Sequence, residues 1–461
     1  MASTDPRLET PERFIFQNMT VALCTDRIAR NFGVPLVRGG PVSVKEIAEI
    51  ARDQFLLTAL SSVLIRGLEL ERFLTHLRKA LLGLVNELDT NSLKLLVALA
   101  QQCFINEYVY DVDDDEMRQI ARLRTELADS APAKLAAIAA YQPLHRLPEA
   151  SKLSGQSWPR AVRDLIRQQI EEPLVEARAT IPALTDIDAT SSSVQQHYEQ
   201  NPYPRWTVSF APLVTAAPAA AEILIAGCGT GKHVFYMARG NPGARILAID
   251  ISRASLAYAS RKTREARLRN IEYAQADILK LGALNRRFDH IEAIGVLHHL
   301  VDPKTGWRVL LSLLKPQGTM RVALYSETAG RAILAARELI ASNGYEPTPE
   351  DIRAVRRHMM GDVTRWRAVL QTEDFYYMSG CRDMLFHVIE HRFTLPDIAA
   401  FLREENLQLV EFEPPPEAVE LFKQQYPNRM NDLDCWHAFE QERPGTFRQM
   451  YQFVVAKASV Q

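Results

Sequence analysis

A short apolar run that ends in three alternating glycines most constrains the fold of this chain. Residues 223–226 read Ile-Leu-Ile-Ala, and Gly227, Gly229 and Gly231 follow at every second position. Such a run predicts a buried strand, and the glycines permit a tight turn and a close approach of the main chain to a ligand. A dinucleotide-binding loop would carry its third glycine at position 232, where this chain has Lys232. The spacing therefore favours a different ligand.

Four further apolar runs, separated by stretches with helical spacing, follow this glycine loop. We expect strands over residues 244–250, 271–277, 288–296 and 318–325, and helices over 252–267 and 303–314. Strands that alternate with helices predict a parallel sheet whose ligands bind at the carboxyl ends of the strands. Asp250 closes the second expected strand, where a carboxylate can accept hydrogen bonds from both hydroxyls of a ribose.

These motifs resemble, in order and spacing, those of class I S-adenosylmethionine-dependent methyltransferases. They are Gly227–Gly231, Asp250, Ala276–Asp277 and Gly295–Leu300. The resemblance implies an α/β fold with a Rossmann-like seven-stranded sheet, six strands parallel and one antiparallel, the last two strands lying over 407–412 and 446–455. It also implies that S-adenosylmethionine is the cofactor, with Asp250 at its ribose and Asp277 at its adenine amino group. The expected cofactor-binding residues are Tyr198, Tyr203, Arg205, Gly227, Cys228, Gly229, Gly231, Asp250, Ile251, Asp277, Ile278 and Val296.

A segment rich in tyrosine and proline precedes the first expected strand. Residues 197–206 read His-Tyr-Glu-Gln-Asn-Pro-Tyr-Pro-Arg-Trp, and the prolines favour an extended path. The segment can cover the cofactor, with a tyrosine or Trp206 against the sulfonium and Arg205 near the carboxylate. It can equally pack between domains without touching a ligand. Members of the resembling family often have an acid just before the first motif glycine, whereas this chain has Ala226, so the cofactor's ammonium needs another acceptor.

The chain is long enough for two domains, since 461 residues exceed what one core usually supports. Helical spacing over residues 1–185 predicts an all-α N-terminal domain, followed by a linker and cofactor-covering segment over 186–206 and the methyltransferase domain over 207–461. Together with residues 386–396 and 98–108, the segment 197–206 is similar to methyltransferase modules that bacteria often fuse to tetratricopeptide-repeat regions. A repeat period of about 34 residues is not present in this sequence.

Charge and cysteine usage exclude several classes of function. The chain carries 54 basic and 56 acidic side chains, for a formal net charge of −2, and this balance does not indicate a nucleic-acid partner. Five scattered cysteines show no disulfide framework, and no apolar run reaches membrane length. We therefore expect a cytoplasmic protein without a membrane span; its oligomeric state stays open.

His298 and His299 follow the fourth expected strand, where the transferred methyl group should point. An imidazole there can take a proton from a hydroxyl or an ammonium, and we expect His298 to be the catalytic residue if a base is used. The alternative is a packing role within the loop, because methyl transfer often needs only proximity and in-line orientation.

Residues 387–391 match a His-x-x-Glu-His zinc pattern, which on a helix would place both histidines on one face. The sequence signals no third ligand, so we expect no metal. We interpret residues 327–393 instead as a lid inserted after the fifth strand. A polar network that fastens this insertion to the N-terminal domain is the alternative. The expected acceptor-binding residues of the lid are Tyr376, Tyr377, Arg382, His387 and His391.

The sequence thus predicts an S-adenosylmethionine-dependent methyltransferase that moves a methyl group by direct in-line transfer to an oxygen or nitrogen of an unidentified acceptor, either a small molecule or a protein. The alternative is a non-catalytic cofactor-binding module whose helical N-terminal domain is a platform for protein interactions.

Overall fold

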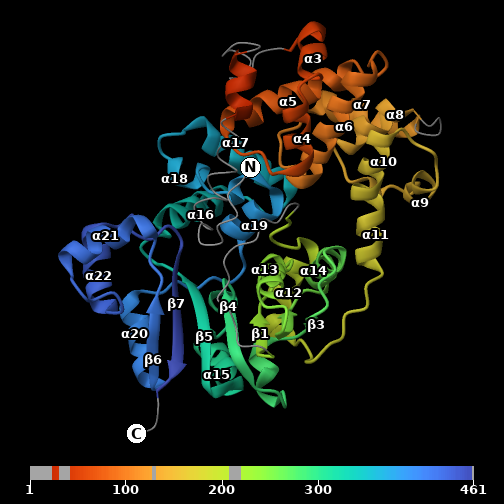
Figure 1. Cartoon of the computed structure of the whole chain (residues 1–461). Coiled ribbons are helices and arrows are strands. Elements are labelled where there is room, and N and C mark those ends of the chain that lie inside the picture. Colours follow the sequence, from red (N-terminus) through yellow and green to blue (C-terminus); the bar gives the residue numbers. More distant parts are fainter. Residues whose placement is uncertain (1–22, 31–41, 127–130, 207–219, 459–461) are drawn as a thin grey trace. The chain divides into compact units, whose positions relative to one another are not determined.

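The computed structural model describes residues 23–30, 42–126, 131–206 and 220–458, and these form two compact units (Figure 1). The first unit is drawn from residues 1–179, 205–212 and 340–386. The second is drawn from residues 180–204, 213–339 and 387–461. Among the described residues, none of the helices combines the length and the apolar character that crossing a bilayer requires.

The first unit is helical throughout its described part. Its helices are α3 (Val44–Ile50), α4 (Gln54–Ser62), α5 (Leu68–Gly83), α6 (Thr90–Ile105), α7 (Asp114–Thr125), α8 (Pro132–Ala139), α9 (Ala150–Ser154), α10 (Arg160–Ile166), α11 (Glu172–Ala177), α17 (Pro349–Gly361), α18 (Arg367–Leu370) and α19 (Met378–Phe386). Short 3₁₀ turns lie at η1 (Leu144–Arg146) and η5 (Asp374–Tyr376), and a π-helical turn, η2 (Arg167–Glu171), joins α10 to α11.

Buried charges tie the late helices of this unit to the early ones. Arg356 of α17 donates to the carboxylate of Glu71 on α5 at 2.7 Å and to the carbonyl of Val109 at 3.0 Å. Both side chains are almost fully buried. An unpaired buried charge is far more costly than a paired one, so α17 is held in place by a partner 285 positions away in the sequence.

The expected lid is therefore divided between the two units. Residues 340–386 pack with the N-terminal helices, whereas residues 327–339 and 387–393 stay with the sheet. The apolar positions of α17, including Ile352, Val355 and Met359, are buried. A segment that buries its apolar face in this way is part of a helical core. Domains drawn as continuous stretches of sequence do not predict this.

The second unit is built on one seven-stranded sheet. Its strands are β1 (Glu222–Ala226), β2 (Arg245–Asp250), β3 (Ile271–Gln275), β4 (Phe288–Ile294), β5 (Leu314–Tyr325), β6 (Leu407–Phe412) and β7 (Met450–Lys457). Their order is β3-β2-β1-β4-β5-β7-β6, and β7 runs antiparallel to both of its neighbours. The expected sheet of six parallel strands and one antiparallel strand is confirmed.

Helices and 3₁₀ turns connect these strands. They are α12 (Ala189–Gln200), α13 (Lys232–Gly240), α14 (Arg253–Glu265), η3 (Ile278–Ala283), η4 (Leu297–His299), α15 (Pro303–Leu313), α16 (Arg331–Asn343), α20 (Leu395–Glu404), α21 (Pro416–Gln425) and α22 (Leu433–Glu442).

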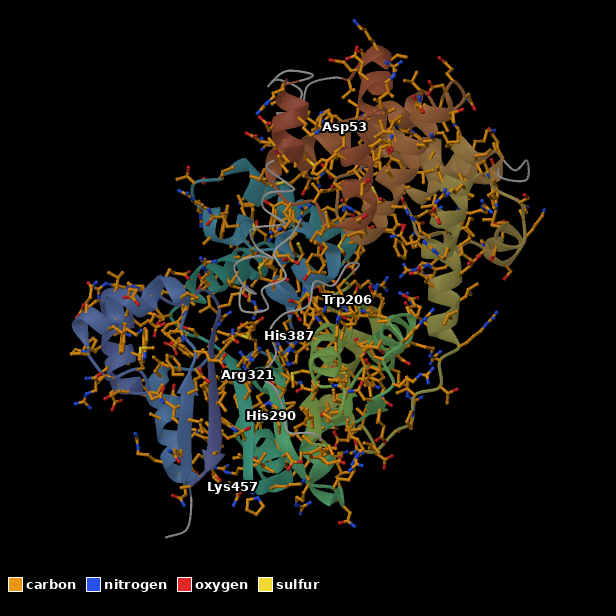
Figure 2. The ribbon with its side chains drawn as sticks, viewed as in Figure 1. Asp53, Trp206, His290, Arg321, His387 and Lys457 are labelled. Carbon is orange, nitrogen blue, oxygen red and sulfur yellow. The ribbon has the colours of Figure 1, made fainter. Side chains whose placement is uncertain are left out.

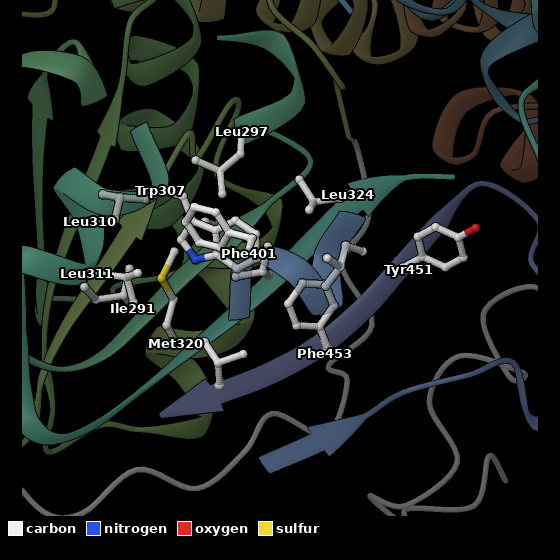
Figure 3. Close-up of a cluster of buried hydrophobic side chains, with 14 of the residues drawn as sticks. Ile291, Leu297, Trp307, Leu310, Leu311, Met320, Leu324, Phe401, Tyr451 and Phe453 are labelled. Atoms are coloured by element: carbon white, nitrogen blue, oxygen red, sulfur yellow. The ribbon is translucent and has the colours of Figure 1, made fainter. Parts of the chain in front are cut away.

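Alternation along β1 divides the apolar residues between two cores. Leu224 and Ala226 belong to a large cluster in which Trp307 of α15 stacks on Phe401 of α20 with ring centroids 4.1 Å apart (Figure 3). Ile223 and Ile225 belong to a second cluster that includes α13. Because successive strand residues point to opposite faces, the sheet is covered on both sides here, as a parallel sheet requires. Because both faces are covered, ligands bind at the carboxyl ends of the strands.

The region expected as a linker forms part of a helix instead. The expected linker and cofactor-covering segment begins at residue 186, but α12 begins at Ala189 with Asp188 as its N-cap. Ser191, Val194 and His197 of this helix are buried. Tertiary burial of one helix face therefore outweighs the polar composition of the segment, and the expected extended path begins only after Gln200.

Candidate functional site

The loop between β1 and α13 is so tight that only glycine fits at two of its positions. Gly227 has a φ of 68°, and a Cβ there would lie 2.3 Å from Cγ2 of Val296, which follows β4. Gly229 has a φ of 52°, and a Cβ there would lie 2.7 Å from the carbonyl oxygen of Tyr203. Side chains rarely adopt such φ values. The glycine loop, Val296 and the carbonyl of Tyr203 thus lie side by side, and their expected contact with a cofactor stays a prediction.

Asp250 ends β2 beside this loop. Its Oδ2 accepts a hydrogen bond from the Gly229 amide at 2.7 Å, and its Oδ1 accepts one from the Ser252 amide at 2.9 Å. Burial raises the pKa of this carboxyl to about 6, against the opposing effect of these amides. Each carboxylate oxygen can accept a second hydrogen bond, so the two oxygens are oriented by main chain and can still receive ligand hydroxyls. The carbonyl of the adjacent Ile251 accepts from the side chain of Gln275.

A second carboxylate at the tip of β2 comes from α12. Oε2 of Glu199 accepts from Oγ of Ser252 at 3.0 Å and from the amide of Ala254 at 3.2 Å, in the first turn of α14. Its negative charge contributes to the raised pKa of Asp250. Sequence reasoning missed Glu199, because the only signal was its place inside the tyrosine- and proline-rich segment.

Asp277 lies after β3 with both carboxylate oxygens engaged. Oδ1 accepts from the amide of Leu279 at 2.9 Å, and Oδ2 accepts from Oγ of Ser191 on α12 at 2.7 Å. The neighbouring Ile278 is buried in the large apolar cluster. Asp277 therefore fastens α12 to the sheet in addition to the adenine contact that the sequence predicts for it, and that contact stays a prediction.

The tyrosine- and proline-rich segment is shared between the two units. Oγ1 of Thr230 in the glycine loop donates to the carbonyl of Pro204, which supports a covering role for this part of the segment. Arg205 belongs to the first unit, where its Nε lies 3.7 Å from Oε1 of Glu107. The expected contact of Arg205 with the cofactor carboxylate stays a prediction.

Three histidines and a tyrosine gather at the carboxyl ends of β4 and β5. The rings of His299 and His387 stack with centroids 3.8 Å apart, and Oη of Tyr198 lies 3.1 Å from Nε2 of His387. In Figure 2, His387 lies toward the carboxyl end of β4, whereas His290 lies nearer its amino end. The ring of His298 packs on Tyr325 with centroids 3.9 Å apart. Within the described residues, neither ring nitrogen of His298 has a hydrogen-bond partner.

Burial holds these imidazoles neutral. Desolvation lowers the pKa of His299 to about 3, and it lowers the pKa of His298 and of His387 well below the usual value of an imidazole. Positive charge contributes as well, since Arg337 lowers the pKa of His299 and of His387 and Arg392 lowers that of His298. Both arginines pair with Glu390, Arg337 at 2.6 Å. All three rings are consequently neutral at pH 7, each with one ring nitrogen protonated. The assignment of His298 as a general base stays a prediction.

Three of the remaining expected lid residues belong to the first unit, and one contacts the histidine cluster through its main chain. Tyr376 donates to the carbonyl of Leu370 at 2.9 Å, and Tyr377 donates to Asp374 at 2.6 Å, both within the first unit. Burial lowers the pKa of Arg382 in the same unit. The amide of His391 donates to the carbonyl of His298 at 2.8 Å. The acceptor role of these residues stays a prediction.

The His-x-x-Glu-His pattern does not lie on a helix, as a zinc site of this type requires. Helix α19 ends at Phe386, and residues 387–391 are not helical. His387 instead accepts the amide of Ile389 at its Nδ1, so the two histidines of the pattern do not share a helix face.

The residues present fit S-adenosylmethionine. Asp250 offers two oriented carboxylate oxygens for the ribose hydroxyls, and the glycine loop exposes main chain where no Cβ interferes. Ala226 is buried in the large apolar cluster, so position 226 supplies no side-chain acceptor for the cofactor's ammonium. The strand order, the glycine loop after β1 and the acids after β2 and β3 together define a class I S-adenosylmethionine-dependent methyltransferase domain, as the sequence predicted.

Comparison with known proteins agrees with this class. Residues 219–378 match the family model described as a methyltransferase domain. An uncharacterized protein of Synechococcus is 40% identical over 121 residues, which is 26% of this chain and 29% of that protein. The ubiquinone biosynthesis O-methyltransferase of Albidiferax ferrireducens is 29% identical over 118 residues, 25% of this chain and 46% of the enzyme. The chain thus matches less than half of the length of these relatives.

Solved structures to which part of this chain is similar include PKMT2 from Rickettsia typhi in complex with AdoHcy. The TM-score is 0.41 at 16% identity, over 54% of this chain and 50% of that one. A methyltransferase described as SAM-dependent from Aquifex aeolicus has a TM-score of 0.29 at 12% identity, over 51% of this chain and 81% of the other.

Proposed function

We propose that the whole chain is a methyltransferase that transfers a methyl group directly to an oxygen or nitrogen of an acceptor. The observation that carries this proposal is the carboxylate of Asp250, with each oxygen oriented by a main-chain amide beside the glycine loop. When bound, S-adenosylmethionine supplies a methyl group on a positively charged sulfur.

The chain's own residues bind and orient in this proposal. Asp250 and Glu199 hold the tip of β2, the segment around Tyr203 covers the glycine loop, and the histidine cluster after β4 faces the acceptor. Positioning is then the main contribution to rate, since a held and aligned pair of reactants avoids much of the entropic barrier. We also propose that residues 340–386 and the N-terminal helices take part in recognising the acceptor, and that the chain acts in the cytoplasm, which its five free cysteines support.

Turnover tests this proposal. The full chain is incubated with S-adenosylmethionine and a panel of hydroxyl compounds, amines and extracted proteins, and S-adenosylhomocysteine release is measured. We expect release that depends on one class of acceptor and that is lost in Asp250→Ala. Binding of S-adenosylhomocysteine without release across the panel would instead favour the non-catalytic binding module.

A further inference from the structure

The main chain of Ile389 holds the two stacked imidazoles in opposite tautomers. Its carbonyl oxygen lies 3.0 Å from Nδ1 of His299, and its amide donates to Nδ1 of His387 at 3.1 Å. A carbonyl oxygen only accepts and an amide only donates. The hydrogen-bond pattern therefore assigns the proton of His299 to Nδ1 and the proton of His387 to Nε2.

These tautomers decide what each ring can do next. His387 uses its Nε2 proton on Oη of Tyr198, 3.1 Å away, so this ring is engaged at both nitrogens. His299 keeps an unprotonated Nε2, because its only proton is on the nitrogen that faces Ile389. The ring is 4% exposed and follows β4 directly, at the edge of the sheet where ligands bind. His298 lacks any comparable orienting bond among the described residues.

Resting on the proposed function, we propose that His299, positioned by the carbonyl of Ile389, accepts the proton of a hydroxyl acceptor through Nε2, so that the site takes neutral hydroxyl compounds such as phenols rather than amines. The acceptor oxygen forms a bond to the methyl carbon, the carbon–sulfur bond breaks with its electron pair going to sulfur, and the hydroxyl proton goes to Nε2. Ile389 and His387 are positioning residues in this scheme.

The electrostatic surroundings separate the two acceptor classes. A hydroxyl oxygen has a lone pair while still protonated, and it becomes strongly acidic as the new bond forms, so a weak base suffices. An ammonium has no lone pair until it loses its proton. Because the pKa of His299 is about 3, far below that of an alkyl ammonium, direct proton transfer from an ammonium to His299 is strongly unfavourable. Arg337, His197 and His391 act on the His299 ring and lower its pKa, His387 stacks on it, and the nearby carboxylate of Glu390 is paired with Arg337 and Arg392.

Nitrogen-15 NMR of the histidine rings tests the arrangement without turnover. The full chain is saturated with S-adenosylhomocysteine, and long-range proton–nitrogen spectra assign the tautomers. We expect Nδ1–H for His299 and Nε2–H for His387. Phenol should shift the Nε2 resonance of His299, whereas benzylamine at the same concentration should not. A His299 ring protonated at Nε2, a response to benzylamine only, or no response to phenol would overturn the proposal.

Two substitutions at one position separate the reacting nitrogen from its support. His299→Asn keeps a donor for the Ile389 carbonyl but lacks Nε2, whereas His299→Gln places an amide near the Nε2 position. We expect the Asn variant to bind phenol about tenfold more weakly, the worth of one hydrogen bond, and the Gln variant to lose less. His437→Gln, on α22, is the control for a histidine outside the cluster. A loss of phenol binding in His298→Gln but not in His299→Asn would contradict the assignment. Absence of S-adenosylhomocysteine binding in the unaltered chain would instead refute the proposed function itself.

Discussion

Asp250 is the side chain on which cofactor binding most depends at the scale of single residues. Its two oxygens are held by the amides of Gly229 and Ser252, and two ribose hydroxyls would complete its hydrogen bonding. Asp250→Ala should therefore weaken S-adenosylhomocysteine binding by about 2–4 kcal/mol, since two hydrogen bonds to a charged group are lost. Titration calorimetry measures this. Asp289→Ala, at the amino end of β4, should bind normally, and unchanged affinity in a folded Asp250→Ala would refute the ribose role.

The raised pKa of Asp250 gives cofactor binding a pH dependence. Ribose hydroxyls donate to the ionised carboxylate, so the ligand binds the deprotonated form. Because the pKa is about 6, affinity for S-adenosylhomocysteine should be flat above this pH and fall about tenfold per unit below it. Asp250→Asn should lack this step, and a wild-type affinity that stays constant through pH 6 would contradict the account.

The same pKa has the opposite effect on the stability of the unliganded fold. The native state holds the proton of Asp250 more tightly than the unfolded chain does, so this residue favours folding at low pH. That contribution is lost as the pH rises through about 6. Ligand binding and fold stability therefore respond to the same carboxyl with opposite signs.

Residues of the candidate site differ in how well the sequence revealed them. The glycines and Asp250 lie at fixed spacings along one strand–loop–helix unit, so local pattern identified them. Glu199 and Ser191 reach the site from α12, and Ile389 acts through its main chain. Contacts between distant segments cannot be predicted from the residue type at one position, and this is true above all of main-chain contacts.

At the scale of elements, the glycine loop packs so closely against the covering segment that it leaves no space for a side chain. Gly229→Ala would place a Cβ 2.7 Å from the Tyr203 carbonyl at a φ of 52°. This main-chain oxygen has no flexible end that could move aside, so the covering segment must shift. We expect the variant to fold with its sheet intact and to lose cofactor affinity, as measured by circular dichroism and calorimetry. Gly282→Ala is the matched control, because its Cβ would meet nothing within 4 Å; equal binding by both variants would contradict the packing described here.

Helix α12 shows where element prediction from sequence fails. Its first turn is Ala-Thr-Ser-Ser, a composition that favours loops, and the helix is stabilised by the Asp188 cap and by burial of Val194 and His197. Burial depends on the sheet beneath, which local composition does not encode. The seven strands, in contrast, carry their own apolar patterns and were placed within about two residues of their observed bounds, apart from the starts of β5 at Leu314 and of β7 at Met450, which each differ by four residues.

At the scale of the whole molecule, the buried ion pair between Arg356 and Glu71 joins segments that are far apart in the sequence. Arg356→Leu would leave Glu71 buried and unpaired, so we expect a loss of about 3–5 kcal/mol in the free energy of unfolding. Adding Glu71→Leu should restore part of it, although the carbonyl of Val109 would still lack its donor. Chemical denaturation measures both variants. Additive losses in the double variant would show that the two side chains are not coupled.

This ion pair also marks what sequence reasoning missed about domain organisation. Two domains were expected from length, and an insertion after the fifth strand was expected from the spacing of strands. The grouping of residues 340–386 with the N-terminal helices rests on partners more than 200 positions away. A fragment lacking residues 1–190 would leave α17 without Glu71, so loss of function in such a fragment would not by itself show a role in acceptor recognition.

Calorimetric titration of the full chain with S-adenosylhomocysteine, and in parallel with NADH, tests which cofactor the site binds. The glycine spacing, Lys232 and the oriented carboxylate of Asp250 all assign the site to the S-adenosyl ligand. We expect one S-adenosylhomocysteine to bind per chain and the titration with NADH to give no binding heat. Binding of NADH, or a folded chain that binds no S-adenosylhomocysteine, would contradict it.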